Sequence, residues 1–232
     1  MKKFLTFFII ASITGSGYSY GQSNEKSKIS YGVKAGINLA SYQVGSDYRT
    51  QVKEAGGMIL PLISFHVGGY ADFSITDAFS VQGGLTLSGK GHKERYSYDE
   101  DDFGLGGAGT SGGTATFIEK LMYLEVPVNA VYKTGRFYMG AGPYLGYALS
   151  GKWREKGEDD DNTDNFNDSG KITFGGDEGY KRTDFGINLL AGYQLKNKIN
   201  LGIGYSLGLS NKDDSDYWSS KNRVFSLSVG YS

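Results

Sequence analysis

The chain contains no cysteine, which excludes a disulfide framework, a thiolate metal site, a cysteine nucleophile and a lipid anchor on an N-terminal cysteine. It has only 3 prolines in 232 residues, beside 36 glycines and 18 tyrosines. Disordered glycine-rich chains usually have more proline and few aromatics, so this combination indicates many β-strands. The formal net charge is -1 and no run of Lys or Arg is present, so we expect no nucleic-acid partner.

A long apolar run is also missing, except for a short one near the start. Two lysines precede an apolar segment from Phe4 to Ile13, and the small residues Ser19 and Gly21 follow at the spacing that a signal peptidase requires. About ten apolar residues are too few for a helix to cross a hydrocarbon core roughly 30 Å thick. We therefore expect a signal peptide that is cleaved before Gln22.

The rest of the chain is expected to form one domain. We assign residues 1–21 to the signal peptide, 22–29 to a short linker and 30–232 to a single β-barrel domain. Transmembrane β-strands need only about 9 to 11 residues with one apolar face, so they leave no strong hydropathy signal. A search for alternating apolar and polar residues is therefore more informative than mean hydropathy.

Alternation with a period of two predicts eight strands. They lie near residues 30–41, 62–73, 78–90, 120–132, 137–150, 182–195, 199–210 and 222–231. The connections near 74–77, 133–136 and 196–198 are short, and those near 42–61, 91–119, 151–181 and 211–221 are long. Short and long connections alternate strictly, which is typical of an antiparallel up-and-down barrel with short periplasmic turns and long extracellular loops.

Each predicted strand has one apolar face and one small or polar face. Leu124, Val126 and Val128, for example, alternate with Glu125 and Asn129. Because successive side chains of a strand point to opposite sides, such a barrel could face lipid with its apolar side or could be a soluble carrier with that side turned inward.

The aromatic residues favour the membrane barrel. Those next to the short turns or a terminus all fall on the apolar face, at one height, as in the aromatic girdle of a membrane interface. These residues are Tyr31, Phe73, Phe79, Tyr132, Phe137, Tyr193 and Tyr231. We therefore expect an integral, multi-pass protein in the outer membrane of a Gram-negative bacterium, with outer-membrane lipid around it.

The polar face would line the interior of the barrel. Eight strands leave room for side chains but not for a diffusion channel. Buried carboxylates need a cationic or hydrogen-bonding partner, so Lys34 could form an interior charge network with Glu125, Asp72 or Asp184. His66 falls on the same face, and we interpret it as a hydrogen-bonded interior histidine because no carboxylate in the local sequence is placed to orient its ring.

Several segments are similar to the PorT-like outer-membrane β-barrel family of Bacteroidetes. The resemblance rests on "YLEVPVNAVYK" (123–133), "GAGPYLGYALSG" (140–151), "DFGINLLAGYQL" (184–195), "YSLGLSN" (205–211) and "NRVFSLSVGY" (222–231). It implies an eight-stranded outer-membrane barrel without catalytic residues. Such barrels usually end on an aromatic residue that the barrel-assembly machinery recognises during insertion, whereas here Ser232 follows Tyr231.

The functional prediction is a non-enzymatic barrel with a structural or surface-interaction role through its long loops, with no cofactor and no resident metal. Trp153, Tyr217 and Trp218 are loop aromatics that could either contact a partner protein or anchor the barrel at the outer membrane interface. The partner expected for the barrel is an unknown surface or periplasmic protein. Two alternatives are a barrel enzyme acting on outer-membrane lipid or surface peptides through His66, and the soluble periplasmic carrier of an apolar ligand. The acidic loop "NFNDSGKI" (165–172) also resembles half of a calcium loop, but Asn165 stands where Asp belongs.

Overall fold

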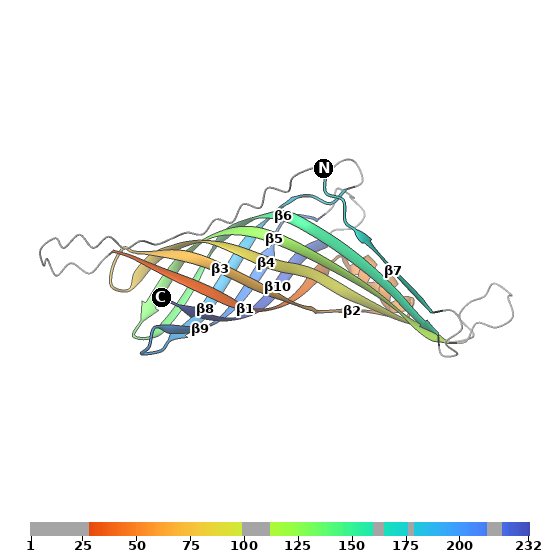
Figure 1. Cartoon of the computed structure of the whole chain (residues 1–232), viewed down its shortest axis with the longest axis horizontal. Helices are drawn as coiled ribbons and strands as arrows, with labels where there is room; N and C mark the ends of the chain where they lie inside the picture. The colour runs from red at the N-terminus through yellow and green to blue at the C-terminus, as the bar shows by residue number, and fades with distance from the viewer. Residues whose placement is uncertain (1–27, 99–111, 160–164, 176–178, 213–219) are drawn as a thin grey trace, which may run out of the picture.

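The computed structural model describes residues 28–98, 112–159, 165–175, 179–212 and 220–232, and these form a closed antiparallel β-barrel (Figure 1). The expected signal peptide and most of the expected linker lie outside the described residues. Eight strands make the wall: β1 (Ile29–Val44), β3 (Leu62–Ser74), β4 (Phe79–Tyr98), β5 (Gly113–Thr134), β6 (Phe137–Asp159), β8 (Thr183–Gln194), β9 (Ile199–Gly208) and β10 (Ser220–Tyr231). All eight predicted wall strands are confirmed.

The sheet closes because the first and last strands pair. Val33 lies opposite Tyr231 and Val44 opposite Ser220, so β1 is bonded to β10 on one side and to β3 on the other. Each remaining wall strand pairs with its neighbours along the wall, from β3 to β10. A closed ring leaves no unpaired wall edge, which is the condition for a β-sheet in lipid.

The short connections lie together at one end of the barrel, as predicted. Gly135 makes the turn between β5 and β6 with φ of 61°, a backbone conformation that suits glycine because it has no Cβ. Lys198 has φ of 65° in the turn between β8 and β9. We call this the short-turn end, and the opposite end the loop end.

The apolar side chains point outward and the polar ones inward. Outer-face residues such as Tyr31 (72% exposed) and Ile63 (72% exposed) have no protein neighbours to cover them, whereas Asn38, Asp72, Glu125 and other polar residues are buried in the lumen. This arrangement excludes the alternative of a soluble carrier, which needs an apolar lumen.

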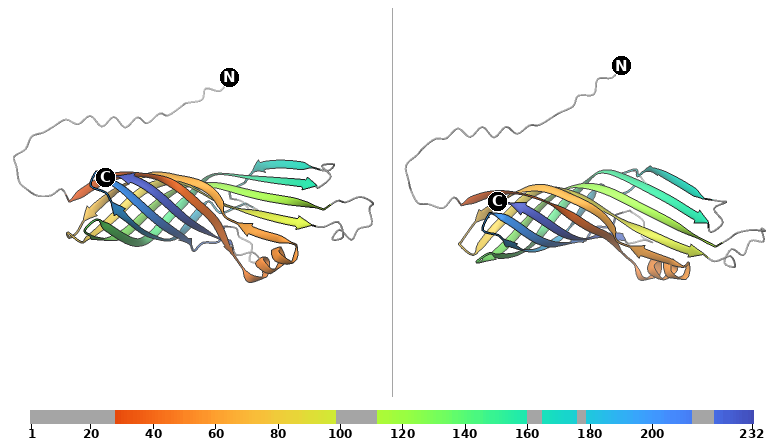
Figure 2. Two further views of the ribbon diagram at one scale, coloured as in Figure 1. Left: turned by 90° about the horizontal axis from the view of Figure 1, so that it is seen from below. Right: turned by 60° about the horizontal axis from the view of Figure 1, so that its bottom comes forward.

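The wall is much taller on one side than the sequence predicted. Strands β4, β5 and β6 have 20, 22 and 23 residues, against 12, 10 and 12 in β8, β9 and β10. Figure 2 shows these three strands running on past the ring at the loop end. Eight to ten further residues in a strand add roughly 30 Å of length.

Two short strands and a helix complete this extension, and the sequence predicted none of them. The helix α1 (Ser46–Glu54) and β2 (Gly57–Leu60) follow β1, and β7 (Phe166–Lys171) follows β6. The strand β2 pairs with β4, and β7 with β6, giving the order β2-β4-β5-β6-β7. We call this unit the loop-side sheet. It consists of β2, β7, residues 92–98 of β4, residues 113–120 of β5 and residues 151–159 of β6.

A β-bulge in β6 marks the start of the loop-side sheet. Tyr123 pairs with Ala148, but its neighbour Met122 pairs with Ser150, so Leu149 is an extra residue in β6. The bulge changes which residues of β6 face outward, from odd to even positions.

Among the described residues, no helix is long and apolar enough to cross a membrane.

Candidate functional sites in the lumen and at the two barrel ends

A buried ion-pair cluster fills the middle of the lumen. The amino group of Lys90, on β4, lies 2.6 Å from Glu125 Oε1 and 2.6 Å from Asp184 Oδ2. Asp184 Oδ2 also accepts hydrogen bonds from the Tyr144 hydroxyl (3.1 Å) and from Asn222 Nδ2 (3.0 Å). Lys90 itself is 1% exposed. Five strands of the wall contribute to this cluster, β4, β5, β6, β8 and β10, so it ties distant parts of the barrel wall together.

Lys34 makes no ion pair with these carboxylates, although it is close enough to Glu125 to interact with its charge. The structure places Lys34, His66, Asp72, Glu125 and Asp184 in the lumen but divides them among separate clusters. Lys90 takes the position that we assigned to Lys34. Parity places Lys90 on the lumen side, since it follows the inward-facing Gln82 and Thr86 by even steps along the same strand, but parity alone does not select it over Lys34.

His66 has only neutral hydrogen-bonding partners at its ring. Its Nδ1 lies 2.8 Å from Asn38 Oδ1 and its Nε2 lies 2.9 Å from Ser228 Oγ. Asn38 in turn donates to Ser88 Oγ (3.2 Å) and to the carbonyl oxygen of Gly89 (3.0 Å). The ring therefore links β1, β3, β4 and β10, as expected for a structural interior histidine.

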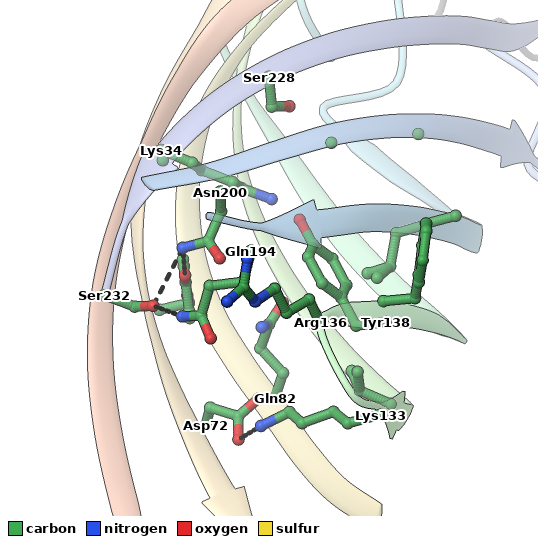
Figure 3. Close-up of a pocket in the computed structure, with 18 of the residues that line it drawn as sticks. Lys34, Asp72, Gln82, Lys133, Arg136, Tyr138, Gln194, Asn200, Ser228 and Ser232 are labelled. Carbon is green, nitrogen blue, oxygen red and sulfur yellow. Dashed lines mark hydrogen bonds and ion pairs between the residues drawn. The ribbon is translucent and has the colours of Figure 1, made fainter. Parts of the chain in front are cut away.

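A cavity of about 370 Å³ opens at the short-turn end (Figure 3). Asp72 is its one carboxylate side chain among the described residues, and its Oδ1 lies 2.5 Å from the Lys133 amino group. Lys34, Arg136 and Lys198 also line the cavity, and none of the three side chains makes an ion pair with another described residue. Figure 3 shows Lys34 and Arg136 pointing into the same space. The cavity therefore has an excess of positive charge and can hold an oxyanion.

A second buried cluster closes the loop end. Glu119 is fully buried on β5, and its carboxylate accepts hydrogen bonds from Tyr42, from the Tyr180 hydroxyl (2.6 Å) and from the Lys212 amino group (3.0 Å). Lys212 also lies over the rings of Tyr42 and Tyr180, 4.3 and 4.2 Å from their centres. Because Tyr180 and Lys212 belong to the third and fourth long connections, the cluster fixes both connections to the barrel mouth.

Glu94 anchors α1 to the loop-side sheet. It accepts hydrogen bonds from the hydroxyls of Tyr48 (2.8 Å) and Tyr96 (2.9 Å), and His92 Nε2 lies 3.1 Å away. Burial alone would raise the pKa of the Glu94 carboxyl, but the hydrogen bonds from His92, Tyr48 and Tyr96 lower it on balance. Burial and the hydrogen bond to Glu94 raise the pKa of Tyr96 to about 12.

A pocket of about 200 Å³ lies between the Glu94 and Glu119 groups. Tyr42, His92 and Phe117 line it together with both carboxylates. His92 falls in the long connection predicted near 91–119, but its ring is buried and lies 4.5 Å from the ring of Tyr42. We missed this group because β4 continues for eight residues past its predicted end at position 90.

The predicted loop aromatics are only partly described. Tyr217 and Trp218 lie outside the described residues. Trp153 lies on β6, not in a loop, and its indole fills the space above Gly170 of β7, where a Cβ would approach Trp153 Nε1 to 2.6 Å.

The segment that resembles a calcium loop is an extended strand. Residues 166–171 form β7, with Asn167 opposite Lys156 and Ser169 opposite Arg154. A calcium loop of this type wraps its ligands around the ion in a tight turn, which an extended strand cannot do. The described part of the chain also holds no group of three or more His, Asp or Glu side chains suited to a metal ion.

The aromatics predicted as a girdle all lie on the outer face near the short-turn end. Phe79 and Tyr132 are neighbours with ring centres 5.0 Å apart, and Phe137 and Tyr193 are neighbours at 4.7 Å. Tyr31, Phe73 and Tyr231 are exposed on the adjoining strands. The two ring pairs also join β4 to β5 and β6 to β8.

A closed eight-stranded barrel with an apolar outside, a polar lumen and unequal ends defines an integral β-barrel membrane protein. The chain belongs to the family described as outer membrane protein beta-barrel domain, whose model matches residues 20–214. The protein is therefore an integral outer-membrane barrel, with its short turns in the periplasm and its loop end outside the cell.

Solved outer-membrane barrels are similar to the chain at low sequence identity. Ail, the attachment invasion locus protein of Yersinia pestis, is 12% identical with a TM-score of 0.37, over 87% of this chain and 96% of that chain. Neisserial surface protein A is 13% identical with a TM-score of 0.42, over 88% of this chain and 97% of that chain. At these values the similarity carries no argument about function. No curated protein matches the chain.

Proposed function

We propose that this barrel is a non-enzymatic surface-interaction protein that presents its loop end to a partner outside the cell. The observation that carries the proposal is the ordered loop end. The loop-side sheet extends the wall roughly 30 Å past the ring, and Glu119 binds residues from two long connections to the mouth. A rigid scaffold that holds connecting segments in place is the usual basis of recognition.

The lumen supports an interaction role more than transport. Lys90, Glu125 and Asp184 occupy the middle of the barrel, between the cavity at the short-turn end and the pocket at the loop end. Breaking a buried ion pair so that one charge loses its partner costs about 3 to 5 kcal/mol, so we expect the cluster to stay in place and act as a plug.

Cross-linking from the two ends of the barrel tests this proposal. Because the chain has no cysteine, a photo-reactive probe can be attached to Glu155→Cys on the loop-side sheet, with Asn197→Cys in a short turn as the matched control. We expect cell-surface adducts from position 155 and none of these from position 197. Equal adduct patterns from both positions would contradict the proposal.

The enzyme alternative predicts that His66 is catalytic. Its ring nitrogens are occupied by Asn38 and Ser228, which supports a structural role. Measuring lipid and peptide hydrolysis by cells that express the wild type or His66→Ala distinguishes a catalytic from a structural role of His66. A hydrolytic activity that His66→Ala abolishes, in a variant that still folds, would overturn the non-enzymatic proposal.

A second candidate function concerns a periplasmic protein partner with an acidic side chain. The positive cavity at the short-turn end favours it, since Lys34, Arg136 and Lys198 have no ion-pair partner among the described residues. Photo-cross-linking from Gln194→Cys, at the rim of the cavity, should give a periplasmic adduct whose yield falls in the Lys34→Gln/Arg136→Gln background. A yield that does not change would rule out recognition by these cations.

The outer-face aromatics are proposed to form a girdle at the periplasmic membrane interface, where Tyr and Phe rings reside at headgroup level.

We also propose that the barrel-assembly machinery recognises the final strand through Tyr231, although Ser232 follows it. Replacing Tyr231 with Ser, but not Ser232 with Ala, should lower the amount of folded barrel in the outer membrane.

Two further proposals concern the origin and processing of the chain. We propose a PorT-like membership within the outer-membrane barrel family, supported by the segments after residue 120; a family tree built on the wall strands alone would test it.

We also propose cleavage after Gly21. Mass spectrometry of the protein extracted from membranes should then find Gln22 as the first residue.

A further inference from the structure

The outer face of the loop-side sheet carries a set of cations that no sequence motif reveals. Lys120 of β5 lies directly opposite Lys152 of β6, which lies directly opposite Lys171 of β7. Three lysines therefore stand in one row across three strands. Directly opposed side chains have Cβ atoms only about 5 Å apart, and like charges at such positions destabilise a sheet.

Two further rows continue this surface. The next row holds Lys93 and Arg154 on either side of Ile118, and the row beyond holds Arg95 and Lys156 on either side of Thr116. The seven cations form what we call the basic face: Lys93, Arg95, Lys120, Lys152, Arg154, Lys156 and Lys171.

Among the described residues, the basic face has no ion-pair partner. None of its seven cations makes an ion pair with a described residue, and Arg154 instead donates from Nε to Asn167 Oδ1 at 2.8 Å. A fourth row follows, with Ser97, Thr114 and Glu158. In these four rows Glu158 carries the only carboxylate among the described side chains, and it lies at the far end of β6. The opposite face of the same sheet carries Glu94 and Glu119.

The basic face continues the lipid-facing surface of the barrel. Two-residue steps along β5 lead from the outward-facing Leu124 through Met122 to Lys120, so all three point to the same side. Lys120 lies about 13 Å farther along the strand than Leu124. On β6 the bulge at Leu149 sets the parity, and it places Lys152, Arg154 and Lys156 outside.

We propose that the basic face binds the phosphate groups of the anionic glycolipid in the outer leaflet of the outer membrane. Charge complementarity fits this occupant, since Lys and Arg bind phosphate through charge-assisted hydrogen bonds. The position fits as well, because the face begins where the apolar belt ends, at the height of lipid headgroups. Long cationic side chains reach such headgroups while their stems remain on apolar surface. The inference does not depend on which partner the loop end recognises.

Native mass spectrometry of the detergent-extracted, folded protein tests the proposal, with bisphosphorylated lipid A and dephosphorylated lipid A as probes. Lys120→Gln/Lys152→Gln/Lys171→Gln should bind bisphosphorylated lipid A about tenfold more weakly than the wild type, because three charge-assisted phosphate contacts are lost. The matched control Arg49→Gln/Lys53→Gln/Lys196→Gln removes the same charge from α1 and a short turn, and it should bind as the wild type does. Dephosphorylated lipid A should not distinguish the three proteins.

Three results would overturn the proposal. One is equal binding of bisphosphorylated lipid A by the wild type and the triple variant of the basic face. Another is an equal loss in the control variant, which would show that only net charge matters. A third is preferential binding of a soluble sulfated polysaccharide that the same variant abolishes, with lipid A binding unchanged. If the triple variant fails to fold, wild-type binding at about 50 and 500 mM NaCl replaces it, and a salt-insensitive affinity would also contradict the proposal.

Discussion

Lys90 and Asp184 are 94 positions apart in the chain, yet the lysine amino group and the carboxylate lie 2.6 Å apart in the centre of the barrel. The same amino group is 2.6 Å from Glu125. A single lysine therefore pairs with two buried carboxylates, which lie on the two strands that flank Gly146 of β6.

Removal of Lys90 should be more damaging than removal of any surface lysine. Lys90→Met leaves two carboxylates buried without their cation, so we expect a loss of about 3 to 5 kcal/mol in the free energy of unfolding. Urea titration of the refolded barrel in lipid vesicles measures it. Lys120→Met, at an exposed position, should change stability by less than about 0.5 kcal/mol. Adding Glu125→Gln and Asp184→Asn to Lys90→Met should restore part of the loss, and no restoration would contradict the charge argument.

The attachment of α1 to the loop-side sheet should weaken in acid. The pKa of Glu94 is lowered in the folded protein, so its stabilisation is complete above the ordinary Glu value of about 4.3 and is lost as the pH falls through the lowered pKa. A spin label on Gln51→Cys, on the exposed side of α1, should be ordered at pH 7 and become mobile below the ordinary value. In a Glu94→Gln background the label should be more mobile already at pH 7. A label that stays ordered throughout would disprove the role of Glu94.

The aromatic pairs at the short-turn end should contribute to stability beyond their burial. Phe137 and Tyr193 meet edge to face with ring centres 4.7 Å apart. A double-mutant cycle with Phe137→Leu and Tyr193→Leu should give a coupling energy of about 0.5 to 1.5 kcal/mol. The non-adjacent pair Phe137 and Tyr31 serves as the control, with coupling near zero. Equal coupling in both cycles would point to a general lipid effect.

The bulge at Leu149 determines which residues of β5 and β6 lie opposite each other in the loop-side sheet, and disulfide formation can test this register. Lys120 is opposite Lys152 only because Leu149 is an extra residue; a regular ladder continued from Tyr123 and Ala148 would place Gly151 there. The cysteine pair Lys120→Cys/Lys152→Cys should therefore form a disulfide readily, and Lys120→Cys/Gly151→Cys should not, because position 151 faces the other side. The reverse outcome would mean that β6 has no bulge.

The wall of the barrel could be predicted from the sequence because each wall strand alternates between lipid and lumen. The short turns could be predicted too, since Gly135 and its neighbours interrupt that alternation. The loop-side sheet could not, because its buried inner face carries polar residues such as His92, Glu94 and Glu119, so the sequence from Lys90 to Glu94 shows no apolar period. Its basic face stayed invisible for the same reason: its cations come from four strands and are brought together by pairing alone.

The sequence predicted which side chains line the lumen but not which of them form ion pairs. Parity identified which side chains face inward, including both carboxylates of the central cluster. It could not decide between Lys34 and Lys90 as their partner, because that choice depends on the stagger of neighbouring strands around the ring. His92 was missed because its strand was predicted to end at position 90, eight residues too early.

Gel mobility of the unboiled and boiled protein, in separated inner-membrane, outer-membrane and periplasmic fractions, tests the central claim most directly. A closed barrel resists detergent and stays compact until it is heated, so we expect a faster unboiled band, confined to the outer membrane, that moves to its full apparent mass after boiling. A single band of unchanged mobility in the soluble periplasmic fraction would contradict a lipid-facing barrel.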